Sequence, residues 1–257
     1  MRVETASEPG DPERPNEDYV AVALPASGHG GALVLLDGVT PPVEGDGCEH
    51  GVPWFTARLG GALLDLATTR VETSLTDCLA EAIARTAAAH STTCDLSHPH
   101  TPQATVVLVR WNDNDVEHLV LSDSVLLLEA PDGTITTVLD ARLDALPRDH
   151  TIETRRNQEG GFFTAAADPS VAERAVFGTT PRPRVRALAA LTDGAGRWVD
   201  VFRFGDWLDA VAALRTGGPS ALIRRVRTAE RQDRGRISFP RDKVSDDATA
   251  AYVELGR

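Results

Sequence analysis

The chain has 257 residues, of which 42% are hydrophobic and 25% are charged, and its net charge is −12 from 38 acidic and 26 basic residues. A chain of this size and composition can bury a hydrophobic core, as one large domain or two small ones. The acidic excess argues against a nucleic-acid partner, which would need a basic face. We find no apolar run long enough to span a membrane and no signal-peptide segment at the start. We therefore expect a cytoplasmic protein with no membrane partner.

The three cysteines, Cys48, Cys78 and Cys94, are widely spaced and include no Cys-x-x-Cys pair. This pattern indicates neither a disulfide framework nor a zinc knuckle. In the segment Cys48-Glu49-His50, the thiol and the imidazole could serve as a local acid or as metal ligands. A plain loop role is the simpler interpretation of these two side chains.

Apolar periodicity divides the first half of the chain into strands and helices. Residues 1–13 are polar and contain proline and glycine, which predicts a loose lead-in. The predicted elements that follow are strands at 19–24 and 31–36 and helices at 52–70 and 73–90. A loop over 39–51 precedes the first helix and another over 91–102 follows the second. We expect this helix pair to cover one face of a sheet.

The second half of the chain begins with β segments that are joined by short turns. These predicted strands lie at 104–110, 116–121, 125–128 and 134–139. Because parallel neighbours need a long crossover, strands joined by such turns are expected to be antiparallel. The region 140–183 is irregular, with a short helix after Asp168-Pro169. The remaining predicted elements are a strand at 186–191, helices at 204–214 and 220–232, and a last strand through Leu255. No linker divides the chain, so we predict a single domain over 1–257.

Acidic residues recur at the ends of the predicted strands. The positions are Asp18, Asp37, Asp123, Asp193 and the pair Asp246-Asp247. Two buried strands end in Asp-Gly, at Asp37-Gly38 and Asp193-Gly194, and a carboxylate beside a glycine that permits close approach is suited to a hard cation. One such pair is usually a turn, but this chain repeats the arrangement. Oxygen donors alone favour Mg²⁺ or Mn²⁺ over zinc, and two such ions could activate water and clamp a phosphoryl group.

The acidic motifs occur in a distinctive order along the chain. They are Asn16-Glu17-Asp18, Leu36-Asp37-Gly38, Ser122-Asp123-Ser124, Thr192-Asp193-Gly194 and Asp246-Asp247-Ala248-Thr249. None is specific alone, but the ordered set resembles the metal-dependent serine/threonine phosphatases of type 2C over nearly the whole length. This resemblance implies an α+β fold, a four-layer α-β-β-α sandwich in which two antiparallel sheets are flanked by helix pairs.

The resemblance also implies a cofactor and an activity. Two Mg²⁺ or Mn²⁺ ions, with a third in a looser site, would activate a hydroxide that hydrolyses a phosphomonoester, foremost phosphoserine or phosphothreonine in a phosphorylated protein. Asp37 would bridge two ions, and the Gly38 carbonyl would bind one of them. Asp193 and Asp246 would hold the other ion. Asp37 and Asp193 are thus the central residues of the implied catalytic site.

Further site residues follow from the same resemblance. Glu17 and Asp18 would act through metal-bound waters, and Asp123 would support the third ion. Arg14 is the candidate phosphate-binding arginine, although it stands one residue closer to the acidic motif than the family pattern places it. Val39 stands where some members carry a histidine that acts as an acid, and the usual Gly-Gly loop is absent here.

Two other functions fit parts of the pattern. The altered loop after Gly38 and the displaced Arg14 favour a regulatory or scaffold module that keeps the fold with weak or no catalysis, whereas the retention of all principal acids argues against it. The segment that begins Leu36-Asp37 also suggests a haloacid-dehalogenase-type enzyme. That chemistry needs a nucleophilic aspartate where this chain has Leu35, so we exclude it.

Overall fold

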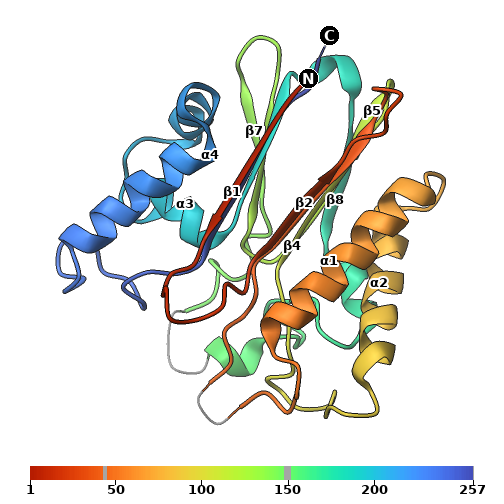
Figure 1. Ribbon diagram of the computed structural model, residues 1–257, viewed down its shortest axis with the longest axis vertical. Coiled ribbons are helices and arrows are strands. Elements are labelled where there is room, and N and C mark those ends of the chain that lie inside the picture. Colours follow the sequence, from red (N-terminus) through yellow and green to blue (C-terminus); the bar gives the residue numbers. More distant parts are fainter. Residues whose placement is uncertain (43–44, 148–151, 257) are drawn as a thin grey trace.

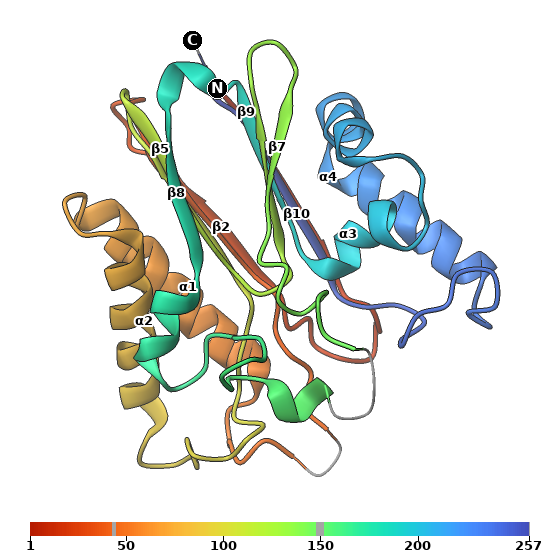
Figure 2. The same cartoon turned by 180° about the vertical axis from the view of Figure 1, so that it is seen from behind.

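In the computed structural model, which describes residues 1–42, 45–147 and 152–256, two five-stranded antiparallel sheets pack face to face (Figures 1 and 2). The first sheet has the order β2 (Tyr19–Ala23), β3 (Gly31–Leu36), β4 (Val106–Trp111), β5 (Asp115–Leu121) and β8 (Val176–Pro181). The second has the order β1 (Arg2–Glu8), β10 (Ala248–Glu254), β9 (Ala187–Leu191), β6 (Val125–Glu129) and β7 (Ile135–Val138).

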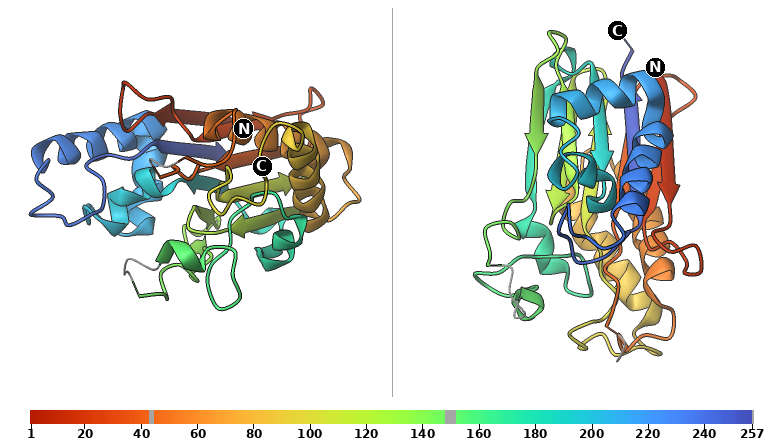
Figure 3. Two further views of the ribbon diagram at one scale, coloured as in Figure 1. Left: turned by 90° about the horizontal axis from the view of Figure 1, so that it is seen from below. Right: turned by 90° about the vertical axis from the view of Figure 1, so that its left-hand side faces the viewer.

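Helices cover the outer face of each sheet. They are α1 (Val52–Thr69) and α2 (Leu75–His90) on the first sheet, and α3 (Asp193–Asp200) and α4 (Trp207–Gln232) on the second. Short 3₁₀ helices lie at Ile152–Arg155, Pro169–Arg174 and Arg182–Arg184. The view from below in Figure 3 shows the sheets between the helix pairs. The predicted four-layer α-β-β-α sandwich is therefore confirmed, and no helix in the described ranges is long and apolar enough to cross a membrane.

Strand β3 shows why the sequence has a continuous apolar run there. Successive side chains point to opposite faces of a strand. Leu33 and Leu35 enter the core between the two sheets, whereas Val34 and Leu36 pack beneath α1 and α2. Because both faces are covered, each position of the strand must be apolar.

The N-terminal residues differ from the predicted loose lead-in, because Arg2–Glu8 forms β1. This edge strand pairs with β10 in a register that runs from Arg2↔Glu254 to Glu8↔Ala248. Val3 packs toward the core between the sheets and Ala6 toward the core beneath α3 and α4. Edge strands tolerate polar residues because one side of their backbone faces solvent, so the composition of this segment concealed the strand.

The turn Ser122-Asp123-Ser124 does not close a hairpin. Strand β5 pairs with β4 and β8, whereas β6 pairs with β7 and β9 in the other sheet. The chain crosses between sheets at this turn, and Ser122 adopts a left-handed φ of 70°. A short connection therefore did not imply pairing between its two flanking strands.

Three smaller differences concern elements in the second half of the chain. The predicted helices at 204–214 and 220–232 are one helix, α4, with a break at Gly218 before Pro219. Strand β8 lies in the region predicted as irregular, and α3 was missed because its glycine-rich start has low helix propensity. Residues 43–44 and 148–151, which fall in the predicted loop and irregular region, lie outside the described residues, as does 257.

Candidate functional site

Segments from both sheets bring acidic side chains together at one end of the sandwich. Strand β3 ends at Leu36, directly before Asp37, and β9 ends at Leu191, shortly before Asp193. Both strand ends lie at the lower end of the sheets in Figure 1. The backbone N–H of Asp193 donates to Asp37 Oδ2 at 3.2 Å, and Thr192 Oγ1 donates to Asp18 Oδ2 at 3.1 Å. The two Asp-Gly motifs, which are 156 residues apart, therefore meet across the interface between the sheets.

The glycines of these motifs permit the close approach of other acid-bearing segments. A Cβ atom on Gly38 would lie 2.4 Å from the carbonyl oxygen of Glu17, and one on Gly194 would lie 1.9 Å from that of Asp247. Both distances are far below van der Waals contact. The Asp-Gly pattern thus has a packing cause here: glycine lets the segments that carry Glu17 and Asp247 pass directly against the strand ends.

Substitution of Gly194 tests this packing. We expect Gly194→Ala to lower the free energy of unfolding by about 1–3 kcal/mol, because the methyl group must displace the Asp247 backbone. Gly61→Ala is the matched control: it lies in α1 with nothing within 4 Å of the added Cβ, and alanine favours a helix over glycine. Denaturant unfolding measures both changes. Equal stability of Gly194→Ala and the unchanged protein would contradict the close approach.

Burial and mutual repulsion raise the pKa values of the clustered carboxyl groups. Burial, with the negative charges of Asp247 and Asp193, raises the pKa of Asp18 to about 8. Burial, with the charges of Asp18 and Asp193, raises the pKa of Asp37 well above its ordinary value. In the described part of the chain, Asp18 Oδ1 is buried without a hydrogen-bond partner. Such a carboxylate cluster is costly unless positive charge compensates it.

Asp193 differs from its neighbours because it reaches solvent at the N-terminus of α3. The surrounding protein and the charges of Asp246 and Asp123 nevertheless raise its pKa to about 7. We attribute the direction of this shift mainly to the neighbouring carboxylates, because water reaches the side chain. Asp193 therefore combines access from solvent with strong coupling to the acidic cluster.

Asp246 is held by two cationic side chains. Its Oδ1 lies 3.0 Å from Lys243 Nζ, and its Oδ2 lies 3.3 Å from Arg197 Nη2. Arg197 is itself buried and forms a 2.8 Å ion pair with Glu230, which also pairs with Arg227 at 2.8 Å. This network fixes the orientation of the Asp246 carboxylate through its contact with Arg197. Lys243 is a site residue that the acidic motifs did not predict. Its position three residues before Asp246 is the sequence feature that could have indicated it.

Asp247 has a different role from Asp246. Its Oδ1 accepts a hydrogen bond from the Gly10 N–H at 2.8 Å, and its Oδ2 accepts one from the Glu17 N–H at 2.6 Å. Both carboxylate oxygens are therefore used to hold the backbone that leads to Asp18. Asp247 positions the acidic segment before β2 and is not placed as a cation ligand.

The other predicted site residues surround this centre. Burial raises the pKa of Glu17, opposed by a 2.6 Å hydrogen bond from Thr40 and by the charge of Arg14. Burial also raises the pKa of Asp123, whose charge contributes to the shifts of Asp37 and Asp193. Arg14 is exposed in the turn before the acidic segment. All the predicted acids thus lie within electrostatic reach of one centre, with Arg14 at its edge.

The donor set of this centre fits hard divalent cations. Its side-chain donors are carboxylate oxygens, which suit Mg²⁺ and Mn²⁺. Repulsion among the acids and the unpaired Oδ1 of Asp18 show where cationic charge would be stabilising. The residues present therefore fit the metal ions that the resemblance implies.

Comparison with known proteins finds structures of similar fold. No protein-family model matches the sequence, and no curated protein matches it. Among solved structures, the chain is similar to the serine/threonine phosphatase Stp1 from Staphylococcus aureus, with 12% identity, a TM-score of 0.62 and coverage of 100% of this chain and 96% of that one.

Two further structures contain metal ions. The catalytic domain of the serine/threonine protein phosphatase PstP, in complex with two manganese ions, has 17% identity, a TM-score of 0.62 and coverage of 100% and 98%. RsbX in complex with magnesium has 11% identity, a TM-score of 0.54 and coverage of 99% and 94%. The chain therefore has the fold of the bacterial serine/threonine phosphatases, as its resemblance to the type 2C enzymes predicted.

Proposed function

We propose that this chain is a Mg²⁺- or Mn²⁺-dependent phosphomonoesterase that acts on phosphoserine or phosphothreonine in proteins. The observation that carries the proposal is the convergence of Asp18, Asp37 and Asp193 at the meeting point of the two sheets. Their charge requires compensation by cations. The proposal is supported by the phosphatases of the same fold, by the manganese ions in PstP and by the magnesium in RsbX.

The chain's own residues have distinct roles in this proposal. Asp37 and the Gly38 carbonyl would hold one cation, and Asp37, Asp193 and Asp246 would hold a second. When bound, these ions would supply the positive charge that stabilises a phosphoryl group and lowers the pKa of water. The buried Arg197 orients Asp246 through their 3.3 Å contact.

The outer residues have supporting roles in the same proposal. Glu17 and Asp18 would act through water, with Thr40 orienting the Glu17 carboxylate. Asp123 would support a looser third ion. The exposed Arg14 is the candidate side chain for the substrate phosphate, because a guanidinium matches phosphate geometry.

A specific contact favours the second candidate, a weakly active regulatory or scaffold module. Lys243 already neutralises Asp246 from 3.0 Å, and a second cation at that carboxylate would compete with it. Val39 also supplies no acid where a histidine would do so. Even so, Lys243 offsets only part of the repulsion, because the pKa of Asp37 stays raised well above its ordinary value by burial and the neighbouring carboxylates, which favours the enzyme.

A metal-dependence assay tests the two candidates. We expect the purified chain to hydrolyse p-nitrophenyl phosphate, to lose this activity in EDTA and to regain it with Mn²⁺ or Mg²⁺ alone. Phosphoserine and phosphothreonine peptides should then be cleaved in preference to a matched phosphotyrosine peptide. Hydrolysis that persists in EDTA would contradict the metal dependence, and absence of hydrolysis with every metal would favour the scaffold module. The cytoplasm stays the predicted compartment.

A further inference from the structure

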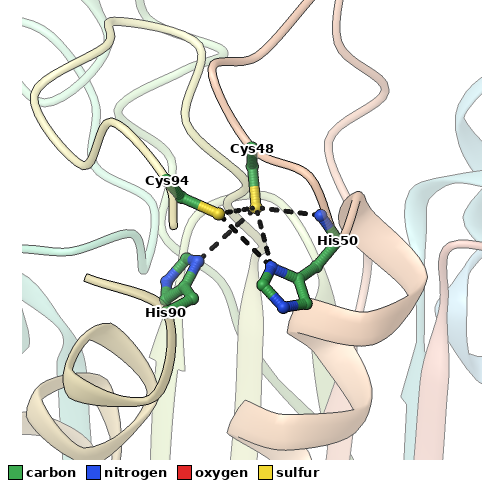
Figure 4. A group of neighbouring side chains, drawn as sticks. All are labelled: Cys48, His50, His90 and Cys94. Carbon is green, nitrogen blue, oxygen red and sulfur yellow. Dashed lines mark hydrogen bonds between the residues drawn. The ribbon is translucent and has the colours of Figure 1, made fainter. Parts of the chain in front are cut away.

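A second group of potential ligands lies between the loop after β3 and the end of α2. It consists of Cys48, His50, His90 and Cys94, which we call the Cys₂His₂ cluster. One ligand atom from each residue lies within 4.8 Å of the other three. Figure 4 shows the sulfur and ring nitrogen atoms directed at one another. These residues are separate from the carboxylates of the proposed active site.

The sulfur–nitrogen distances within the cluster are close to those of a tetrahedral site. Cys48 Sγ lies 3.5 Å from His90 Nδ1 and 3.7 Å from His50 Nδ1, and Cys94 Sγ lies 3.3 Å from His50 Nδ1. Zinc–sulfur bonds of about 2.3 Å and zinc–nitrogen bonds of about 2.0 Å place ligand atoms roughly 3.3–3.8 Å apart in a tetrahedron. The sulfur–sulfur distance of 3.0 Å is shorter than this range, so the two sulfur atoms would have to separate by about 0.8 Å around zinc. It is also longer than the approximately 2.05 Å of a disulfide. The cysteines are therefore free thiols placed as neighbours.

Backbone N–H groups donate hydrogen bonds to both sulfur atoms of the cluster. The backbone N–H of Glu49 donates to Cys94 Sγ at 3.4 Å, and that of His50 donates to Cys48 Sγ at 3.4 Å. Hydrogen bonds to ligand atoms are the usual second layer of a metal site, because they stabilise and orient the ligands.

The imidazole rings are also held in place. His90 is 2% exposed, and its ring centre lies 5.1 Å from that of Trp54 and 6.5 Å from that of Phe55. The exposed His50 also packs against Trp54, with 4.2 Å between the ring centres. Both rings are thus oriented toward the sulfur atoms by packing, which lowers the conformational cost of binding a metal.

We propose that the Cys₂His₂ cluster binds one zinc ion as a closed, structural site. Two thiolates and two imidazoles complete a four-coordinate shell and leave no position for a substrate. Sulfur ligands select zinc over the harder Mg²⁺ and Mn²⁺. The ligand pattern is Cys48-x-His50 followed by His90-x₃-Cys94, and the pairs are brought together only by the packing of the loop on α2.

The position of this site suggests what the ion would stabilise. It would join the loop after Gly38 to the C-terminal end of α2, next to the 2.9 Å hydrogen bond from Asp95 N–H to the Gly47 carbonyl. The same loop carries Thr40, whose hydroxyl donates to Glu17. Zinc would therefore fix the segment that follows Asp37-Gly38. This inference rests on the cluster itself and not on the proposed phosphatase activity.

Metal analysis of the purified full chain tests the site. We expect about one zinc ion per chain, retained in excess Mg²⁺, and most of it lost in Cys94→Ser and His90→Ala. Cys78→Ala, which changes a buried cysteine outside the cluster, and His29→Ala, at an exposed histidine, should keep their zinc. Replacement of zinc by Co²⁺ should give a thiolate-to-cobalt charge-transfer band and the intense visible bands of tetrahedral coordination.

Several outcomes would overturn the proposal. One is a chain that contains no zinc and gives no cobalt spectrum after addition of either metal. Another is a Cys48–Cys94 disulfide that mass spectrometry detects in protein purified without reductant. The same disulfide would have to form again when the reduced protein is exposed to air with zinc present. A third is zinc loss in Cys78→Ala equal to that in Cys94→Ser. His50→Ala keeps the test decisive if the other variants fail to fold, because His50 is exposed. This variant should stay folded and show an altered cobalt spectrum.

The same measurement separates this inference from the proposed function. Asp193→Asn should keep its zinc whether or not phosphatase activity depends on that aspartate. Conversely, Cys94→Ser should lose zinc even if the chain proves to be a scaffold. Failure of one proposal therefore leaves the other testable.

Discussion

Asp193→Asn is expected to abolish metal-dependent phosphatase activity while the chain stays folded. Asparagine keeps the shape of the side chain but removes the charge that would balance a cation. Because bound metals contribute several kcal/mol to phosphoryl transfer, the rate should fall by about 10²–10⁴-fold. Steady-state hydrolysis of p-nitrophenyl phosphate at saturating Mn²⁺ measures the loss. Unfolding of the same variant should be no easier than that of the unchanged protein, since one member of a repelling cluster is gone.

Asp247→Asn is the matched control, because the same chemical change is made in the same cluster. An amide offers one acceptor oxygen, whereas Asp247 accepts hydrogen bonds from the N–H groups of both Gly10 and Glu17. We therefore expect a loss of about 1–3 kcal/mol in the free energy of unfolding, with most activity retained below the melting temperature. An equal loss of activity in both variants would contradict the assignment of Asp193 and Asp246 as ligands. Unchanged activity in both would favour the scaffold module.

The stability of the metal-free chain is expected to fall as the pH rises from near neutral to about 8. The folded-state pKa of Asp18 is raised to about 8 and that of Asp193 to about 7, so the folded chain holds protons that the unfolded chain has released. The stabilisation from these protons is complete below the unfolded pKa, about 3.9. It is lost as the pH passes through the folded pKa. Mn²⁺ should reverse the trend, because deprotonated carboxylates bind the ion.

Thermal melting after removal of the divalent ions, with and without added Mn²⁺, measures this linkage. Measurements above about pH 7 avoid most of the titration of the seven histidines. At 100 times the dissociation constant, Mn²⁺ should stabilise the chain by about 2.7 kcal/mol, and the gain should be larger at high pH. Asp18→Asn should weaken the pH dependence, whereas Asp132→Asn, at an exposed hairpin, should not. A metal-free melting temperature that rises over this interval would contradict the cluster's raised pKa values.

Local patterns determined much of the secondary structure. The apolar run at 31–36 is a strand buried on both faces, and the periodic segments at 52–70 and 73–90 are helices α1 and α2 to within a few residues. These predictions succeeded because burial and backbone geometry impose a period that neighbouring residues share. The ordered acidic motifs likewise indicated the fold and its carboxylate centre, because each motif lies within a few residues at a strand end.

Only the tertiary structure decided how these pieces meet. The crossing between sheets at Ser122 depends on strand pairing over long distances, and β1 is a strand only because β10 lies beside it. The dual hydrogen bonds of Asp247 and the Cys₂His₂ cluster join residues from distant parts of the chain. No local period or spacing encodes such contacts, because they arise from the packing of whole layers. The sequence therefore identified the acids, and the packing determined which of them meet and which residues, such as Lys243, join them.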